Sequence, residues 1–387
     1  MNLIVSDGGR PQGSGAAMTA AFRERLDPSS NSLNALRLLL ALVVILSHSW
    51  TLGGYGREPT IGGETAGTWA VFGFFVVSGY LITGSRLRSD FGDYLQRRLV
   101  RIYPGFLVCL VVTAFVFAPI GYWTANHTLH GFAMTAGSPI NYILSNITLK
   151  MNTYAIAGTP IHTPYPGAWD GSLWSLYYEF ICYLVIGVAG GWALFRRGPT
   201  VVAAMFIVAS LGEFQVQRVM RYAQNGDLVF ILELAPFFLA GSLLYMVRDR
   251  IPCRAIIALA SCAVIGIILL LNSRQLVVFC ALPLSYLFLW LGVTLPLRRV
   301  GNRNDISYGV YIYGFPVSQL LAVLRVNRHG QFIDVALTML LTIPLAAASW
   351  LIVERPAMRS ARRRPAQQAG IQPPLPTKPR PAAAAPR

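Results

Sequence analysis

An arginine and a histidine share the first long apolar run of this chain, where lipid would surround a helix. Arg37 and His48 are eleven residues apart, which in an α-helix is a rotation of about 1100° and leaves them within about 20° of each other. They therefore lie on one helix face, about 16 Å apart along the axis. Because a neutral imidazole can remove a proton near neutral pH, His48 is a candidate catalytic base. Arg37 is either its partner or a side chain that extends to the membrane interface.

Glu179 is a further candidate catalytic residue, because it lies just inside a later apolar run, 173–194. Ionisable side chains within spans cost at least about 2.5 kcal/mol for Arg, Lys or Asp near the centre, so each is a functional hypothesis. Glu179 could pair with an arginine, orient an imidazole, or stabilise the positive end of the helix dipole. Glu354 and Arg355 are interpreted as an interfacial ion pair, and Glu233 has no assigned partner.

Three arginines gather before the apolar run 102–119 and form a candidate phosphate site. Arg97, Arg98 and Arg101 surround the start of a helix, and Arg98 and Arg101 share one face. A positive charge on the cytoplasmic side explains one or two of them, but guanidinium groups also bind phosphate through paired hydrogen bonds. A phosphorylated ligand such as coenzyme A would fit this cluster.

Other chemical motifs give little. The sequence contains no G-x-x-x-x-G-K-[ST], H-E-x-x-H or G-x-S-x-G pattern, and no metal site is expected. Ser78 and Gly79, in the apolar run 67–85, first suggest close helix packing, with a covalent nucleophile at Ser78 as the alternative.

The composition requires membrane-spanning elements to position these residues. Of 387 residues, 54% are hydrophobic and 12% are charged, about half the charged share of a soluble domain, near 25%. A span needs roughly 20 apolar residues as a helix. We predict an all-α polytopic membrane bundle of about ten transmembrane helices. The runs are 33–51, 67–85, 102–119, 173–194, 199–214, 228–247, 255–271, 276–296, 306–325 and 333–353.

The net charge of +16 fits either a nucleic-acid-binding protein or the cytoplasmic loops of a membrane protein. With a cytoplasmic N-terminus and alternating sides, 24 of the 32 basic residues fall on the cytoplasmic side and seven outside, with Arg37 in a span. This bias predicts that both termini are cytoplasmic. Because the basic residues are dispersed at helix ends, nucleic acid is not an expected partner.

The chain is expected to have one membrane domain between two tails. Residues 1–30 form a cytoplasmic N-terminal tail, and 31–356 form the membrane domain with a long outer loop at 120–171. Residues 357–387 are rich in Pro, Ala and Arg, so a disordered basic cytoplasmic tail is predicted there.

Six motifs in one order resemble the acyltransferase-3 family of integral-membrane O-acyltransferases. They are Arg37-x10-His48, Phe74-Phe75-x-x-Ser78-Gly79-Tyr80-Leu81-Ile82, Arg97-Arg98-x-x-Arg101-Ile102-Tyr103-Pro104, Ser172-Leu173-Trp174-Ser175-Leu176-Tyr177-Tyr178-Glu179, Asp305-Ile306-Ser307-Tyr308-Gly309-Val310-Tyr311 and Val353-Glu354-Arg355-Pro356. They cover residues 31–356, nearly the whole predicted membrane domain.

The resemblance implies transfer of an acyl group, commonly acetyl, from cytoplasmic acyl-coenzyme A to a hydroxyl of an extracytoplasmic or lipid-linked saccharide. Under it His48 is the essential histidine, Arg37 its partner and Glu179 the acidic residue, with Arg98 and Arg101 in the donor-binding motif. The expected partners are acetyl-CoA or another acyl-CoA as co-substrate, a saccharide or glycolipid acceptor, and membrane lipid. The expected location is the bacterial inner membrane.

Two departures from the family pattern affect this reading. Many relatives have a histidine shortly after the Asp-x-Ser-Tyr motif, where this chain has Gly314. No extracytoplasmic esterase-like domain, which some relatives carry, is expected in this chain, which would then either finish the transfer alone or hand the acyl group to a separate partner. A proton-coupled transporter or flippase of a lipid-linked sugar, with His48 as a proton relay, is the alternative function. A non-catalytic scaffold would leave the Arg37 and His48 pair unexplained.

Overall fold

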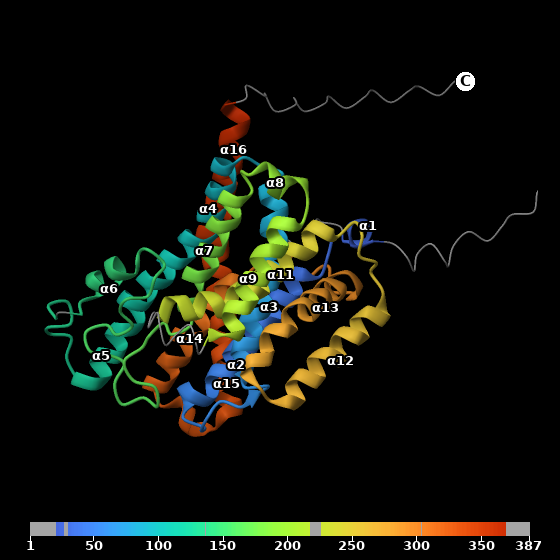
Figure 1. Ribbon diagram of the computed structural model, residues 1–387. Coiled ribbons are helices and arrows are strands. Elements are labelled where there is room, and N and C mark those ends of the chain that lie inside the picture. Colours follow the sequence, from blue (N-terminus) through green and yellow to red (C-terminus); the bar gives the residue numbers. More distant parts are fainter. Residues whose placement is uncertain (1–20, 27–29, 136, 217–225, 303, 369–387) are drawn as a thin grey trace, which may run out of the picture.

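The computed structural model describes residues 21–26, 30–135, 137–216, 226–302 and 304–368, which form a bundle of helices (Figure 1). The helices of the first half are α1 (Phe22–Arg25), α2 (Leu33–Gly53), α3 (Ala66–Leu87), α4 (Phe91–Val112), α5 (Ala118–Asn126), α6 (Pro139–Asn146), α7 (Trp174–Ala189) and α8 (Ala193–Arg197). The second half contains α9 (Thr200–Phe214), α11 (Gly226–Val247), α12 (Ala255–Leu271), α13 (Ala281–Thr294), α14 (Ser307–Val323), α15 (Gln331–Ser349) and α16 (Arg355–Gln368).

Shorter elements connect these helices. Strands β1 (Thr60–Ile61) and β2 (Glu64–Thr65) pair antiparallel between α2 and α3, with Thr60 opposite Thr65. The π-helical turns η1 (Thr113–Phe117) and η4 (Trp350–Glu354) each join two α-helices without a break. The 3₁₀ turns η2 (Arg274–Cys280) and η3 (Val326–His329) precede α13 and α15.

The all-α architecture is confirmed, and each of the ten predicted apolar runs falls on helix. Within the described residues, six helical segments are long and apolar enough to cross a membrane. They are Leu33–Gly53, Ala66–Leu87, Phe91–Asn126, Gly226–Val247, Arg274–Thr294 and Gln331–Ala361. Because α7, α9 and α12 are apolar but shorter, the number of ten crossings stays a prediction, as does the side of each terminus.

Helix α3 lies at the centre of the bundle, against α2, α11 and α13. A side chain at Gly79 would overlap the carbonyl oxygen of Phe238, and one at Gly241 would overlap that of Val76. The rings of Phe72 and Phe237 stack above each other, with centroids 3.9 Å apart. The close helix packing predicted from Ser78 and Gly79 is therefore confirmed.

The predicted outer loop 120–171 begins within α5 and contains α6. A buried carboxylate anchors it to the bundle: the Tyr142 hydroxyl donates to Asp170, and the Thr113 hydroxyl lies 3.5 Å from the same carboxylate. Burial raises the pKa of Asp170 to about 7, although these donors oppose the rise. The anchor fixes the chain immediately before the Ser172–Glu179 motif.

Parts of both predicted tails are structured. Phe22 of α1 is buried and lies edge-on to Tyr286, with ring centroids 5.1 Å apart. Residues 357–368, predicted to be disordered, are helical, because η4 continues α15 into α16 and α16 packs against α4. Residues 1–20 and 369–387 of the predicted tails lie outside the described residues.

Candidate active site

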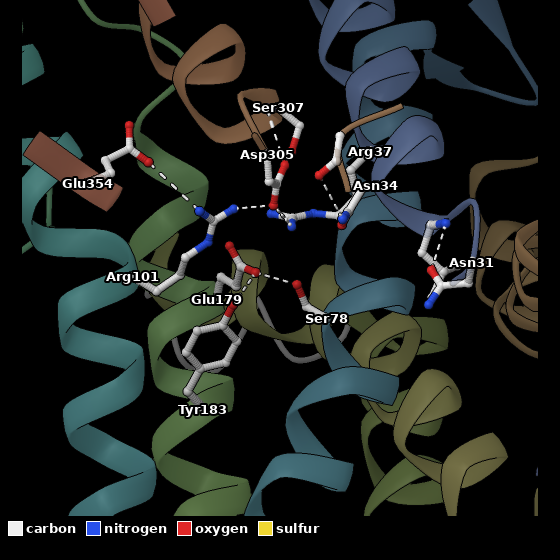
Figure 2. A network of polar contacts seen from close by, with 12 residues as sticks. Asn31, Asn34, Arg37, Ser78, Arg101, Glu179, Tyr183, Asp305, Ser307 and Glu354 are labelled. Carbon is white, nitrogen blue, oxygen red and sulfur yellow. Dashed lines mark hydrogen bonds and ion pairs between the residues drawn. The ribbon is translucent and has the colours of Figure 1, made fainter. Parts of the chain in front are cut away.

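Arg37 and Arg101, predicted for different roles, meet on one carboxylate oxygen (Figure 2). Arg37 lies 2.8 Å from Oδ2 of Asp305, and Arg101 lies 2.5 Å from the same atom. The Ser307 hydroxyl donates to the other oxygen at 2.6 Å. Burial alone would raise the pKa of Asp305, but the two arginines outweigh it, and the pKa is lowered to about 2. Asp305 is therefore ionised at any physiological pH.

A second carboxylate extends this cluster. Glu354 is buried, accepts a hydrogen bond from Ser349 at 3.1 Å, and lies 3.8 Å from Arg101. Glu354 therefore pairs with Arg101 of α4, and the interpretation of Glu354 as the partner of its neighbour Arg355 is replaced. We call Arg37, Arg101, Asp305 and Glu354 the Asp305 network.

Glu179 lies beside the Asp305 network and not beside His48. Its Oε1 accepts hydrogen bonds from Ser78 and Tyr183, each at 2.5 Å (Figure 2). Glu179 and Arg37 line one small cavity of about 30 Å³. A cavity of this size holds a water molecule or two and is too small for an acyl thioester.

His48 lies toward the other end of α2 and faces a much larger space. It lines a cavity of about 830 Å³ together with Phe315, whose ring lies edge-on to the imidazole at 5.5 Å. His48 makes no hydrogen bond to any residue that the structure describes. Eleven residues of helix separate it from Arg37 by about 16 Å. The structure thus brings Arg37 and Glu179 together and leaves His48 apart from them.

We call the space next to His48 the aromatic cavity, because rings form much of its wall. The rings come from Tyr154, Tyr165, Trp174, Tyr177, Tyr178 and Phe230. Lys150 forms an ion pair with Asp227 at its edge, and the Tyr178 hydroxyl donates to Asp227 at 2.8 Å. Its volume is within the range of about 300–1,000 Å³ that is usual for small-molecule sites. The cavity therefore combines flat apolar surfaces with groups that can bond to hydroxyls.

A third space, the arginine cavity, contains the predicted phosphate site. It has a volume of about 810 Å³ and is lined by Arg97, Arg98, Arg101 and Asp305, among others. Arg101 is committed to the Asp305 network, and the exposed Arg97 lies 3.6 Å from Asp93. Arg98 forms no ion pair with any described residue, and its Nε is buried without a hydrogen-bond partner. Of these three arginines, Arg98 therefore has a buried N–H donor that an anion could use.

A separate buried charge network gives Glu233 the partner that the sequence did not identify. Arg274 lies 2.7 Å from Glu64, 2.9 Å from Glu213 and 3.1 Å from Glu233. Burial raises the pKa of Glu64 to about 7; Arg274 opposes this rise, whereas Glu233 and Glu213 add to it. We call these four residues the Arg274 network. It joins the β1–β2 hairpin to α9, α11 and η2.

Asp305, Ser307 and Tyr183 were not predicted from the sequence as site residues. Asp305 and Ser307 stand in one of the six motifs, and that membership was the only signal for them. Asp305 is 268 residues from Arg37, so no local spacing could reveal the pair. Among the described residues, no group of three or more His, Cys, Asp or Glu side chains is arranged to hold a metal ion.

Most of this chain matches known proteins. A family model described as an acyltransferase domain matches residues 30–354. An O-acetyl transferase of Shigella phage Sf6 is 29% identical over 341 residues, which cover 84% of this chain and 95% of the relative. Nodulation protein 10 of Rhizobium leguminosarum bv. viciae is 26% identical over 367 residues, covering 85% of this chain and 93% of that protein. No solved structure matches the chain.

The family model covers most of the chain, and the six apolar helical segments suit a membrane protein. The comparisons give no support to a transporter or flippase. The protein therefore belongs to the acyltransferase-3 family of integral-membrane O-acyltransferases.

Proposed function

We propose that this protein transfers an acyl group, acetyl in the simplest case, from cytoplasmic acyl-CoA to a hydroxyl of an extracytoplasmic or lipid-linked saccharide. The observation that carries the proposal is the pair of large cavities toward opposite ends of α2. One is lined by arginines and the other by aromatic rings. Relatives named for O-acetyl transfer support the reaction class.

The arginine cavity is the proposed donor site. Its arginines suit the phosphates of coenzyme A, and Arg98 has a buried donor without a partner. The most basic parts of the chain are predicted to be cytoplasmic, where acyl-CoA is found. From this cavity the thioester end of the donor would pass the Asp305 network toward Glu179.

The aromatic cavity is the proposed acceptor site. Sugar rings have apolar C–H faces that pack on aromatic rings, and hydroxyls that bond to groups such as Asp227 and Lys150. His48, at this cavity, has no hydrogen bond to a described residue, so its imidazole is available to a substrate hydroxyl.

The chemical step needs one base. His48 removes the proton of the acceptor hydroxyl as the oxygen attacks the thioester carbonyl, and a new C–O bond forms. The C–S bond then breaks, coenzyme A leaves as the thiolate, and the proton on His48 passes to that sulfur or to water. The cavity of about 30 Å³ beside Arg37 and Glu179 is too narrow for the donor arm, so transfer requires it to widen.

A histidine substitution tests this function. His48→Ala should lower the formation of acylated product by about 100- to 10,000-fold, because a positioned general base contributes that much. Mass spectrometry of surface glycans, with and without the gene, would identify the acceptor by the mass of an acetyl group on each modified sugar.

His329→Ala is the matched control, because His329 is exposed in η3, away from both cavities. It should leave product formation unchanged. Near-normal acylation by His48→Ala, at an equal amount of membrane-inserted protein, would refute the assignment of the base.

A further inference from the structure

The arginine cavity has two walls of different chemistry. Helix α4 supplies the polar wall, with Arg97 and Arg98 as its cations. The C-terminal segment supplies an apolar part of the lining, with Trp350 of η4 and Met358 and Ala361 of α16. Of these three residues, Met358 and Ala361 lie after the last predicted span, 333–353, and Trp350 lies near its end.

The position of α16 follows from the turn before it. The π-helical turn η4 continues α15 into α16, so the chain stays helical and packs beside α4. Figure 1 shows α16 next to α4 at the end of the bundle remote from the β1–β2 hairpin. Met358 and Ala361 are three residues apart, so both lie on the helix face that borders the cavity. Residues 355–361 contain Arg355 and Arg359 and no acidic residue.

A ligand for this cavity needs anionic groups on one side and a flat apolar group on the other. Phosphates suit the arginine wall, where Arg98 has a buried Nε without a partner. A planar base suits the apolar wall, since a methionine thioether packs well against aromatic rings. The Arg101 guanidinium already lies over the Trp350 ring, 5.6 Å from its centroid, which leaves Met358 and Ala361 as the free apolar surface.

We propose that α16 is part of the donor site, with Met358 and Ala361 packing against the adenine ring of acyl-CoA while Arg98 holds its phosphates. The inference rests on the proposed function, because it assumes that acyl-CoA is the donor. It assigns nucleotide recognition to a segment that composition alone describes as a tail. The phosphopantetheine arm makes no use of this wall.

A comparison of two acyl donors tests the contact with the nucleotide separately from the transfer of the acyl group. One is acetyl-CoA, and the other is S-acetyl-4′-phosphopantetheine, which has the same thioester arm and lacks the adenosine part. Steady-state rates of acyl transfer from each donor are measured with the full-length protein in lipid vesicles. The wild-type protein should have a higher KM for the truncated donor.

Ala361→Trp should fill the cavity next to the adenine ring. We expect the KM for acetyl-CoA to rise on the order of ten-fold, as for the loss of one well-packed apolar contact. The kcat at saturation and the KM for the truncated donor should not change. Ser360→Trp is the matched control, since Ser360 is exposed and does not line the cavity.

A second variant avoids the risk that an added bulky side chain disturbs folding. Met358→Ala removes apolar surface without adding bulk and should weaken the binding of free coenzyme A, measured by calorimetry, by about three- to ten-fold. An unchanged KM for acetyl-CoA in both variants, or an equal rise with both donors, would overturn the role of α16. Failure of the wild-type protein to use either donor would instead refute the proposed function.

Discussion

The two buried charge networks of this protein differ in their balance of charges. The Asp305 network contains two arginines and two carboxylates, whereas the Arg274 network contains one arginine and three carboxylates. Asp305 and Glu64, one carboxylate from each network, respond in opposite directions: the pKa of Asp305 is lowered to about 2 and that of Glu64 is raised to about 7.

The difference follows from the cost of burying charge. An ion away from water is tolerated when a partner of opposite sign and hydrogen bonds replace its hydration, and otherwise the group becomes neutral. Asp305 has two arginine partners and a hydrogen bond from Ser307, so this carboxylate stays ionised across the physiological range. The Arg274 network has excess carboxylates and lowers its energy by keeping a proton. The proposed donor route thus runs beside a carboxylate, Asp305, whose charge does not change over the physiological pH range.

Asp305→Asn should have the largest effect, because it leaves Arg37 and Arg101 without their shared carboxylate. Removing one partner of a buried ion pair costs about 3–5 kcal/mol in soluble proteins. We expect a clear fall in the midpoint of thermal unfolding in detergent, followed by tryptophan fluorescence, and loss of acyl transfer.

Asp249→Asn is the control for that substitution. Asp249 also pairs with an arginine, Arg23, at 3.5 Å, but the side chains are 48% and 68% exposed. Exposed pairs contribute about 0–1 kcal/mol, so the midpoint should barely move. Equal stability of the two variants would mean that the Asp305 network is not needed for folding.

Arg274→Met should have an intermediate effect that depends on pH. It removes the cation that Glu64, Glu213 and Glu233 share, but these carboxyl groups can become neutral by binding protons. The variant should therefore lose more stability at pH 8 than at pH 5.5, measured as the unfolding midpoint at each pH. Arg328→Met, at an exposed arginine of η3, is the control. An equal loss of stability at both pH values would contradict the prediction that these carboxyl groups become neutral at the lower pH.

Glu64→Gln should have the smallest effect and should change mainly the pH dependence. Because the pKa of Glu64 is raised from 4.5 to about 7, the folded state holds this proton more tightly than the unfolded chain. Its contribution to stability is therefore lost as the pH rises from about 4.5 through about 7. The variant should lose less stability than the parent between pH 5.5 and 8. A steeper loss of stability with rising pH in the variant would contradict the raised pKa of Glu64.

Local spacing predicted the parts of the site that lie on one helix. Arg37 and His48 share a face of α2, and the arginines 97, 98 and 101 line one cavity from within α4, which begins earlier than predicted, at Phe91. The helical nature of all ten apolar runs was also predictable, since apolar runs of this length are stable in lipid only when their backbone groups bond within the segment.

Contacts between distant segments were not predictable in this way. The pairing of Arg101 with Asp305 joins residues 204 positions apart, and the Ser78 hydroxyl that donates to Glu179 is 101 positions from it along the chain. The helix α16 was predicted to be disordered because its Pro, Ala and Arg residues cannot bury a core alone. It is ordered because α15 continues into it and α4 supports it.

Residue types and their spacing specify the helical class, the apolar runs, the candidate residues and, through the order of the motifs, the family. These features depend on residue type and on helical periodicity, which are local properties. The tertiary structure adds that the arginines of α2 and α4 share Asp305, that His48 faces a separate aromatic cavity, and that α16 lines the arginine cavity. Those features depend on which helices pack together, and packing brings together side chains whose separation along the chain carries no information about their distance in space.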